Sequence, residues 1–394
     1  MSVAEFRMPQ VLHYGTGAVD KVTEVARLLG KKALIISDPI MQRLGNVDLV
    51  GERLHQAGVE FAVYLEVDTE PTNLHVEEAL SRFRMDGCDI LVAIGGGSCL
   101  DAAKAVAVVA TNGGAIGDYM GGKTLISHLP VPLIVIPTTA GTGSEVTSVT
   151  VITSTQDDVK MMIRHPAFIP YAAIVDPQLT LSSSPQVTAA TGVDALCHAI
   201  EAYISRRQQP MTDTLALSAI QLISENILLA YRDGQNLKAR EKMALAAMQA
   251  GLAFTNASVC LVHGMSRPIG AVFHVPHGIS NAMLLPSVLE YSMDACTDRL
   301  AAIGRMLNKD WLERPDAAVA VDVVRHVKEL CRDLDIPNMR GWGLDEAKFE
   351  ASLTQMAMDA IASGSPDNNP KVPSHEEIME MYRTAFDADF AENG

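Results

Sequence analysis

The stretch "ILVAIGGGSCLDAAKA", residues 90–105, joins a continuous apolar run to a helical pattern through three consecutive glycines. The apolar run predicts a buried strand, and the segment after Ser98 has the spacing of a helix. Glycines at this junction let the backbone approach a ligand closely, and the N–H groups at the start of the helix suit a pyrophosphate. The stretch therefore predicts a βα unit with a phosphate-binding loop. It lacks the GxGxxG fingerprint, and an ordinary tight turn is the alternative.

The segments on both sides of this unit continue the alternation of strands and helices. Apolar, β-branched runs at 31–38, 60–67 and 132–137 predict further strands, and residues 46–58 and 74–87 have helical spacing. Continuous apolar strands that alternate with helices are typical of a parallel sheet covered on both faces. We therefore expect residues 1–184 to form an α/β dinucleotide-binding domain.

The pattern changes after about residue 185. Segments 188–205, 212–233, 237–254 and 316–334 have helical apolar spacing, and β-rich runs are nearly absent. At 394 residues the chain is too long for one compact core. We expect residues 185–394 to form a second, all-helical domain, so the predicted fold class is an α/β domain with a parallel sheet followed by an all-α domain.

Composition narrows the range of functions. A net charge of −16 without any Lys/Arg-rich run disfavours binding to nucleic acid and to anionic membranes. The N-terminus lacks the pattern of a signal peptide, and no run of about 18 apolar residues predicts a membrane span. The six cysteines are scattered without a CxxC pair, which is typical of reduced cytosolic thiols. We expect a cytoplasmic globular protein.

A second loop follows the strand at 132–137. The segment "PTTAGTGSE", residues 137–145, carries two glycines and hydroxyls that could line a ribose or nicotinamide, those of Thr138, Thr139, Thr142 and Ser144. Open α/β sheets bind ligands at the carboxyl ends of their strands, where both loops are expected. Asp38 ends another strand, and its carboxylate can accept from ribose hydroxyls and repel a 2′-phosphate, which favours NAD over NADP. A helix cap or turn is the alternative for Asp38.

Histidines gather in "LVHGMSRPIGAVFHVPHG", residues 261–278, which holds three of the chain's 11. Upstream, Asp194 and His198 are four residues apart on a predicted helix and therefore share a face. With His263 and His277 they make one carboxylate and three imidazoles, which suit a divalent transition metal such as Fe²⁺ or Zn²⁺. A mixed set of this kind indicates a catalytic metal, and hydrogen-bonded core histidines are the alternative.

These motifs, in this order, resemble those of the iron-containing (group III) alcohol dehydrogenases over nearly the whole chain. The segments that carry the resemblance are "GTGAVDKV" (15–22), "GGGSCLDAAKA" (95–105), "PTTAGTGSEVTSVTVIT" (137–153), "GVDALCHAIEAY" (192–203), residues 261–278 and "NNPKVPSHEEIMEMYRTAF" (368–386). The resemblance implies the fold shared with dehydroquinate synthase-like proteins and an active cleft between the two domains.

The resemblance also implies roles for individual residues. It implies metal ligands at Asp194, His198, His263 and His277, and a position lining the substrate pocket at Phe254. It implies contacts to NAD(P) at Asp38, Gly96, Gly97, Ser98, Asp101, Thr138, Thr139, Thr142 and Lys160. Members of the family commonly assemble as dimers or larger, so a homo-oligomer is expected.

Arg267 departs from the family pattern, because many members have a histidine there that is thought to help proton movement. His274 is the candidate to replace that histidine, and a structural role is its alternative. Arg267 lies one helical turn after His263, so we expect it to point toward the same cleft. Its partner is either an internal carboxylate, for example Glu201 or Asp367, or an anionic tail on the substrate, such as a carboxylate, sulfonate or phosphonate.

The predicted function is metal-dependent, NAD(H)-linked interconversion of a small primary alcohol and its aldehyde, with the metal acting as a Lewis acid on the substrate oxygen. A polyol-phosphate dehydrogenase or a dehydroquinate synthase-like lyase is the alternative among enzymes of this architecture. A non-catalytic metal- or nucleotide-binding protein is the alternative outside catalysis, and such a protein need not keep both loops and all four ligands.

Overall fold

The computed structural model describes residues 3–157 and 159–390, which divide into two compact units. Residues 7–183 form an α/β unit. Residues 184–390, together with residues 3–6, form a helical unit.

The α/β unit is built on a six-stranded parallel sheet with the order β1–β8–β5–β4–β2–β3. Its strands are β1 (Val11–Tyr14), β2 (Lys32–Ile36), β3 (Glu60–Tyr64), β4 (Ile90–Gly95), β5 (Leu133–Pro137) and β8 (Ala172–Val175). Its helices are α1 (Val22–Leu29), α2 (Pro39–Arg43), α3 (Asn46–Ala57), α4 (Asn73–Met85) and α5 (Gly97–Asn112). Strands β6 (Val149–Ser154) and β7 (Val159–Arg164) form a separate antiparallel hairpin, which the sequence patterns did not predict.

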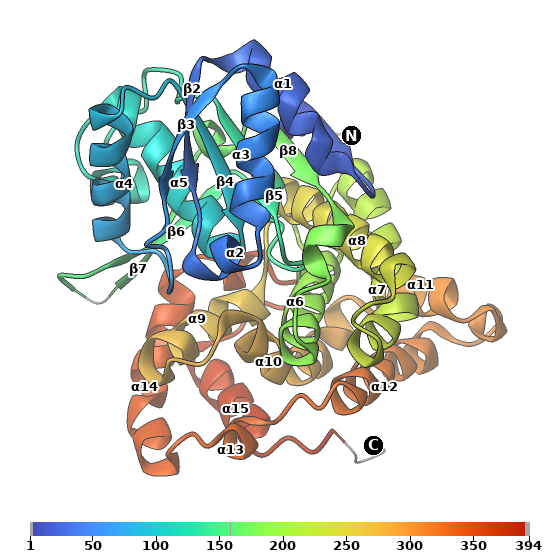
Figure 1. Ribbon diagram of the computed structural model, residues 1–394. Helices are drawn as coiled ribbons and strands as arrows, with labels where there is room; N and C mark the ends of the chain where they lie inside the picture. Colours follow the sequence, from blue (N-terminus) through green and yellow to red (C-terminus); the bar gives the residue numbers. More distant parts are fainter. Residues whose placement is uncertain (1–2, 158, 391–394) are drawn as a thin grey trace. The chain divides into compact units, whose positions relative to one another are not determined.

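Helices cover both faces of the parallel sheet (Figure 1). On one face, side chains such as Ile35, Val92 and Ile134 pack with α1 and α3 in a single aliphatic core. Helices α4 and α5 contact the sheet from the other side. The central strands are continuous apolar runs because both of their faces are buried. The predicted parallel sheet is therefore confirmed.

The chain order of this sheet creates the place where open α/β sheets bind ligands. After β2 the chain crosses to β3 at the sheet edge, and it then returns to β4 on the other side of β2. The connections that follow β2 and β4 therefore leave in opposite directions, and open α/β sheets bind their ligands at the carboxyl ends of two strands related in this way. Asp38 follows β2, and the glycine loop 95–97 follows β4. Two predicted cofactor elements thus lie at this switch point.

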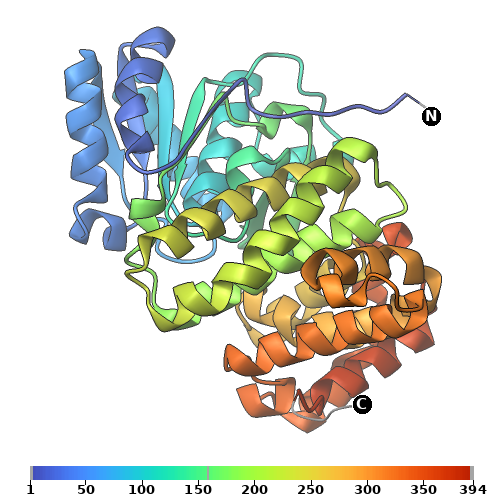
Figure 2. The same cartoon turned by 90° about the vertical axis from the view of Figure 1, so that its right-hand side faces the viewer.

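The helical unit carries the remaining α-helices. These are α6 (Pro185–Ile204), α7 (Pro210–Arg232), α8 (Leu237–Ala257), α9 (Leu261–Phe273), α10 (His277–Ser292), α11 (Thr297–Leu307), α12 (Asp316–Asp333), α13 (Met339–Trp342), α14 (Glu346–Ala362) and α15 (His375–Phe386). Figure 2 shows α6, α7 and α8 as long neighbouring helices, and each packs on the other two. Helix α10 contacts both α6 and α9, so the predicted metal ligands come from helices in mutual contact.

Helix α7 meets the length and hydropathy of a membrane span by composition alone, as do two bent helix pairs. The sequence patterns had not indicated such a segment. In the helical unit, α7 packs against α6 and α8 with Ala216, Ile220, Ile223 and Ile227 buried. Part of its apolar character is therefore explained by a helix face that packs inside this unit, where 33% of the apolar window is buried.

Candidate active site

The glycine loop after β4 is shaped for close approach of the backbone to a ligand. Gly96 is the N-cap of α5, Gly97 and Ser98 open the helix, and no side chain caps it. The first N–H groups of α5 can therefore bind an anion. Gly95 has a φ of 151°, and a Cβ there would lie 2.6 Å from the sulfur of Cys99. The loop thus requires glycine at position 95 for both conformation and space.

Asp38 has two different surroundings for its two carboxylate oxygens. Oδ1 accepts hydrogen bonds from the N–H groups of Ile40 (2.8 Å) and Met41 (2.9 Å), so Asp38 is the N-cap of α2. Oδ2 lies 3.6 Å from Sγ of Cys99, near the start of α5. The helix cap, which the sequence offered as the alternative to cofactor binding, is present. The cap engages one carboxylate oxygen and leaves the other beside Cys99 and the glycine loop.

The loop after β5 lies against the glycine loop. The N–H of Thr138 donates to the carbonyl oxygen of Gly95 at 2.9 Å. The side chain of Thr142 borders Gly97, where a Cβ would approach its Oγ1 to 3.1 Å. Thr139 lies near the same loop, and its Cγ2 is 4.0 Å from the place that a Cβ on Gly96 would occupy. The structure therefore brings the three predicted threonines together around the glycine loop.

Two other residues predicted to contact the cofactor have partners within the α/β unit. Asp101 accepts hydrogen bonds from the hydroxyl of Ser144 (2.5 Å) and the N–H of Val151 (2.9 Å). Lys160, on β7, forms an ion pair with Glu70 at 2.7 Å. These contacts connect α5 to the second loop and the hairpin to the segment before α4. A cofactor contact by either residue would share or replace the partner seen here.

Three helices position the predicted metal ligands. Asp194 and His198 lie one turn apart on α6, His263 is the third residue of α9, and His277 is the first residue of α10. Oδ1 of Asp194 lies 3.6 Å from Nε2 of His263 and 3.9 Å from Nε2 of His277. One donor atom from each of these three residues lies within 4.8 Å of the other two. Such a group of one carboxylate and two imidazoles fits a divalent transition metal.

His198 flanks this group of three. Its Nδ1 lies 3.9 Å from Oδ1 of Asp194, and its ring stacks between Phe254 and His263 at centroid distances of 4.1 and 4.3 Å. Phe254, predicted to line the substrate pocket, therefore packs directly on a predicted ligand.

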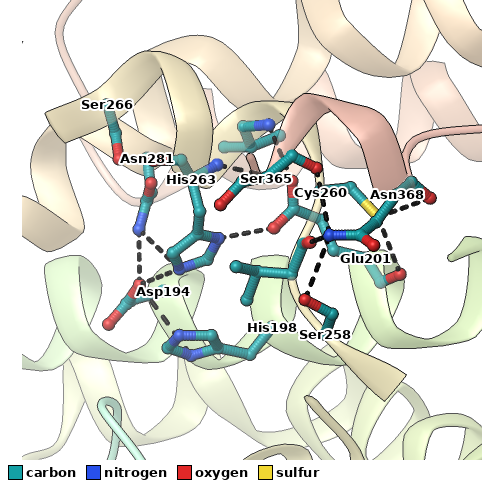
Figure 3. Close-up of polar contacts among 12 residues, drawn as sticks. Asp194, His198, Glu201, Ser258, Cys260, His263, Ser266, Asn281, Ser365 and Asn368 are labelled. Atoms are coloured by element: carbon teal, nitrogen blue, oxygen red, sulfur yellow. Dashed lines mark hydrogen bonds and ion pairs between the residues drawn. The ribbon is translucent and has the colours of Figure 1, made fainter. Parts of the chain in front are cut away.

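Figure 3 shows that the His263 ring is held from both sides. Its Nδ1 lies 2.5 Å from Oε2 of Glu201, and its Nε2 lies 3.1 Å from the amide nitrogen of Asn281. That amide also donates to Oδ1 of Asp194 at 2.6 Å. The sequence interpretation did not assign Asn281, and it considered Glu201 only as a partner for Arg267. Helical spacing was the available signal, because Glu201 continues the face of α6 that bears Asp194.

Comparison with known proteins places the chain in a family. The model for iron-containing alcohol dehydrogenase matches residues 9–177, and the C-terminal model of the Fe-containing alcohol dehydrogenase family matches residues 188–386. The chain belongs to the iron-containing alcohol dehydrogenases. The predicted family and fold are therefore confirmed. The predicted enzyme class, an oxidoreductase that acts on alcohols or aldehydes, is also confirmed.

Individual members of the iron-containing alcohol dehydrogenases match the chain over nearly its whole length. It is 39% identical to the 1,3-propanediol dehydrogenase of Citrobacter freundii over 97% of this chain and 98% of the relative. The crystal structure of a 1,3-propanediol oxidoreductase matches with a TM-score of 0.94 at 37% identity, covering 98% of this chain and 100% of that one. The sulfoacetaldehyde reductase of Bifidobacterium kashiwanohense, solved in complex with NAD⁺, matches with a TM-score of 0.87 at 27% identity, covering 99% and 100%.

The charges around the ligand cluster of this alcohol dehydrogenase are strongly coupled. Burial disfavours ionisation of Asp194, but the neighbouring imidazoles, His198 first, outweigh it and hold the pKa of Asp194 well below its usual range. Burial also opposes a positive charge on His263, but Glu201 and Asp194 together raise the pKa of His263 to about 9. The carboxylates thus favour positive charge at His263, whereas burial lowers the pKa of His277 to about 3 and keeps that ring neutral, the form in which an imidazole can bind a metal.

Arg267 of this alcohol dehydrogenase lies one turn after His263, and its Nη1 donates to the hydroxyl of Ser365 at 3.2 Å. Among residues 3–157 and 159–390, no carboxylate forms an ion pair with this guanidinium within 4.0 Å, and neither Glu201 nor Asp367 is such a partner. Burial lowers the pKa of Arg267 to about 10, although Glu201 opposes this shift, so the side chain is charged at neutral pH. The internal pairing that the sequence suggested is therefore not formed.

His274 ends helix α9. Its backbone is in the left-handed region with a φ of 55°, and its N–H donates to the carbonyl oxygen of Gly270 at 3.0 Å. The residue is exposed. The structure thus places His274 at the C-cap of α9 through its backbone, and the role of its imidazole in proton movement stays a prediction.

Proposed function

We propose that this enzyme transfers hydride between NAD(H) and a small primary alcohol or aldehyde, with a divalent metal held by Asp194, His198, His263 and His277. The observation that carries this proposal is the convergence of donor atoms from three helices, one carboxylate and two imidazoles within 4.8 Å. This donor set suits Fe²⁺ or Zn²⁺, and the family favours Fe²⁺. When bound, the ion supplies a Lewis acid for the substrate oxygen.

The chain's own groups have separate tasks in this proposal. The glycine loop 95–97 and the start of α5 bind the pyrophosphate of the dinucleotide through backbone N–H groups. Oδ2 of Asp38, the oxygen that does not cap α2, accepts from a ribose hydroxyl. Thr139 and Thr142 offer hydroxyls from the second loop. Phe254, stacked on His198, forms an apolar wall that limits access of water to the substrate.

Arg267 indicates the substrate class that we propose. Among the described residues, this charged and partly buried guanidinium has a hydroxyl partner and no ion pair within 4.0 Å, so its charge is poorly compensated. A carboxylate, sulfonate or phosphonate at the end of a short substrate would supply two charge-assisted hydrogen bonds. One structural relative is named a sulfoacetaldehyde reductase, and sulfoacetaldehyde is a short aldehyde with an anionic tail. We therefore propose an anionic short-chain aldehyde as the preferred substrate.

The test is an NADH-linked assay of protein reconstituted with Fe²⁺ or Zn²⁺, using aldehydes matched in length. Sulfoacetaldehyde is compared with propanal, and succinic semialdehyde with butanal. We expect higher kcat/KM for the acids by about tenfold or more, the size of a charge-assisted contact worth about 1.5–3 kcal/mol. Arg267→Met should remove this preference and spare the neutral aldehydes.

Arg299→Met is the matched control, because Arg299 lies in the same unit but is already paired with Asp213 at 2.6 Å. It should leave the acid preference unchanged. If neutral aldehydes are the better substrates, Arg267 does not bind the substrate. If metal-loaded protein oxidises no NADH with any aldehyde, the dehydrogenase proposal fails and a non-catalytic binding protein takes its place.

We also propose a cytoplasmic homo-oligomer. The cysteines of the described chain are buried free thiols, which are typical of a reducing compartment. Light scattering coupled to size-exclusion chromatography measures the mass in solution, and a mass near 42.3 kDa would contradict an oligomer.

A further inference from the structure

Glu201 is a buried carboxylate on the face of α6 that carries Asp194 and His198. Only 1% of the surface of Glu201 is exposed. Oε1 accepts a hydrogen bond from the N–H of Val262 at 2.7 Å, and Oε2 lies 2.5 Å from Nδ1 of His263. These partners all belong to the first turn of α9, so one side chain of α6 holds both the start of that helix and the ring of a predicted metal ligand (Figure 3).

The contact to Nδ1 decides which nitrogen of His263 faces the cluster. A carboxylate can only accept, so Nδ1 must carry the hydrogen that points to Glu201. The opposite nitrogen, Nε2, is turned toward Asp194 and lies 3.6 Å from its Oδ1. A histidine held in this way presents the lone pair of Nε2 to a metal, and a carboxylate on the other nitrogen fixes the orientation of the ring and strengthens the ligand.

We propose that Glu201 is a positioning residue of the metal centre, which acts through His263 and sets the affinity for the ion. The proposal rests on the proposed metal-dependent function. It goes beyond the four ligands, because it assigns to a fifth residue the orientation of one of them. Glu201 does not itself coordinate the ion in this proposal, because its two oxygens are occupied by α9.

Glu201→Gln separates this role from simple packing. If the glutamine oxygen keeps the bond to the N–H of Val262, its NH₂ group faces Nδ1 of His263. The imidazole must then accept at Nδ1 and carry its hydrogen on Nε2, the atom that would bind the metal. If the amide is turned round, its NH₂ group meets the N–H of Val262 as donor against donor. Either orientation sacrifices one of the two contacts, while the volume of the side chain is kept.

The experiment measures Zn²⁺ affinity by competition with a chromogenic chelator. We expect Glu201→Gln to bind Zn²⁺ about 10- to 100-fold more weakly than the unmodified protein. In a His263→Ala background, adding Glu201→Gln should change the affinity by less than about twofold, because the residue through which Glu201 acts is gone. Asp322→Asn is the matched control. It removes another buried carboxylate of the helical unit, one paired with Arg314 and Arg325, and should leave Zn²⁺ affinity unchanged.

A second measurement uses the Zn²⁺-loaded unmodified protein and does not depend on the folding of any Glu201 variant. Proton NMR should show one strongly downfield, exchange-protected N–H signal from Nδ1 of His263, assigned through long-range ¹H–¹⁵N correlations within the ring and side chain of that histidine. Its absence, or coordination of Zn²⁺ through Nδ1, overturns the proposal.

Three outcomes of the Zn²⁺ affinity measurements also test the proposed role of Glu201. Unchanged affinity in Glu201→Gln refutes the role of Glu201 and leaves the dehydrogenase proposal standing. An equal loss in the presence and absence of His263 shows that Glu201 does not act through that ring. If the unmodified protein binds neither Zn²⁺ nor Fe²⁺, the metal-dependent function fails and this proposal fails with it.

Discussion

Substitutions at Asp38 can separate cofactor choice from helix capping. We predict that the unmodified enzyme prefers NADH and that Asp38→Asn shifts this preference toward NADPH without a large loss of stability. Asparagine is as good an N-cap as aspartate, so it keeps the acceptor for the N–H groups of Ile40 and Met41 and removes only the charge. Asp38→Gly removes both the charge and the cap, at a cost of only a few tenths of a kcal/mol.

The size of the shift follows from the repulsion between a carboxylate and a 2′-phosphate. Two like charges 4–5 Å apart repel by about 3–4 kcal/mol at an effective dielectric constant of about 20. Asp38 is partly exposed, so solvent screens this repulsion and reduces it to about 1.4–2 kcal/mol. That difference corresponds to a change of about 10- to 30-fold in the ratio of kcat/KM for NADH to kcat/KM for NADPH.

The assay measures initial rates with one saturating aldehyde while each reduced cofactor is varied. Thermal melts of the same preparations report whether the cap of α2 is preserved. The reasoning is refuted if the unmodified enzyme uses the two cofactors equally, or if Asp38→Asn keeps the original ratio while its stability is unaffected.

Three further predictions concern the metal cluster and the fold. His263→Ala should lose most bound metal, measured by elemental analysis, and most turnover; full metal content with full activity would exclude His263 as a ligand. Gly278→Ala should lower stability by about 1–3 kcal/mol in denaturant titrations, because its Cβ would lie 2.5 Å from the carbonyl oxygen of Ala190. Burial raises the pKa of Glu145 to about 7 from an ordinary value of 4.5. Between these two pH values the unfolded chain releases this proton first, so the native state loses stability as the pH rises. Glu145→Gln should flatten that loss, of up to about 3 kcal/mol, and an unchanged pH profile would contradict the buried, raised carboxyl.

The parallel sheet could be predicted from the sequence because its central strands are buried on both faces. Such strands are uninterrupted apolar runs, and the glycines that follow 90–94 mark where the chain turns into a helix. The hairpin of β6 and β7 was missed for the opposite reason. Its residues alternate between buried and partly exposed positions in short runs of six, and polar residues such as Thr153 and Lys160 weaken the strand pattern. Local periodicity therefore detects the elements that fill the core better than those at its border.

The metal cluster illustrates a different limit. Spacing on α6 is enough to place Asp194, His198 and Glu201 on one face, because residues three and four apart are neighbours on a helix. Spacing does not say which other helices meet that face. Helix α10 comes close to α6 because Gly278 has no side chain, and this approach also positions the adjacent predicted ligand, His277. A glycine that follows a histidine has no distinctive sequence pattern, so the contact between α10 and α6 could not be predicted from it.

The orientation of His263 depends on a carboxylate 62 residues earlier in the chain. Sequence reasoning offered that carboxylate, or Asp367, as one of two kinds of partner for Arg267, the other being an anionic tail on the substrate. In the structure Glu201 contacts the first turn of α9, and within the described part of the chain the hydroxyl of Ser365 is the hydrogen-bond partner of Arg267. The two results are linked. Because both oxygens of Glu201 contact α9 and the predicted ligand His263, no carboxylate of the described residues forms an ion pair with Arg267 within 4.0 Å, although Glu201 still favours its charge. This is the feature from which we infer an anionic substrate. If Glu201→Gln weakens metal binding and Arg267→Met removes the acid preference, both follow from this one distribution of partners.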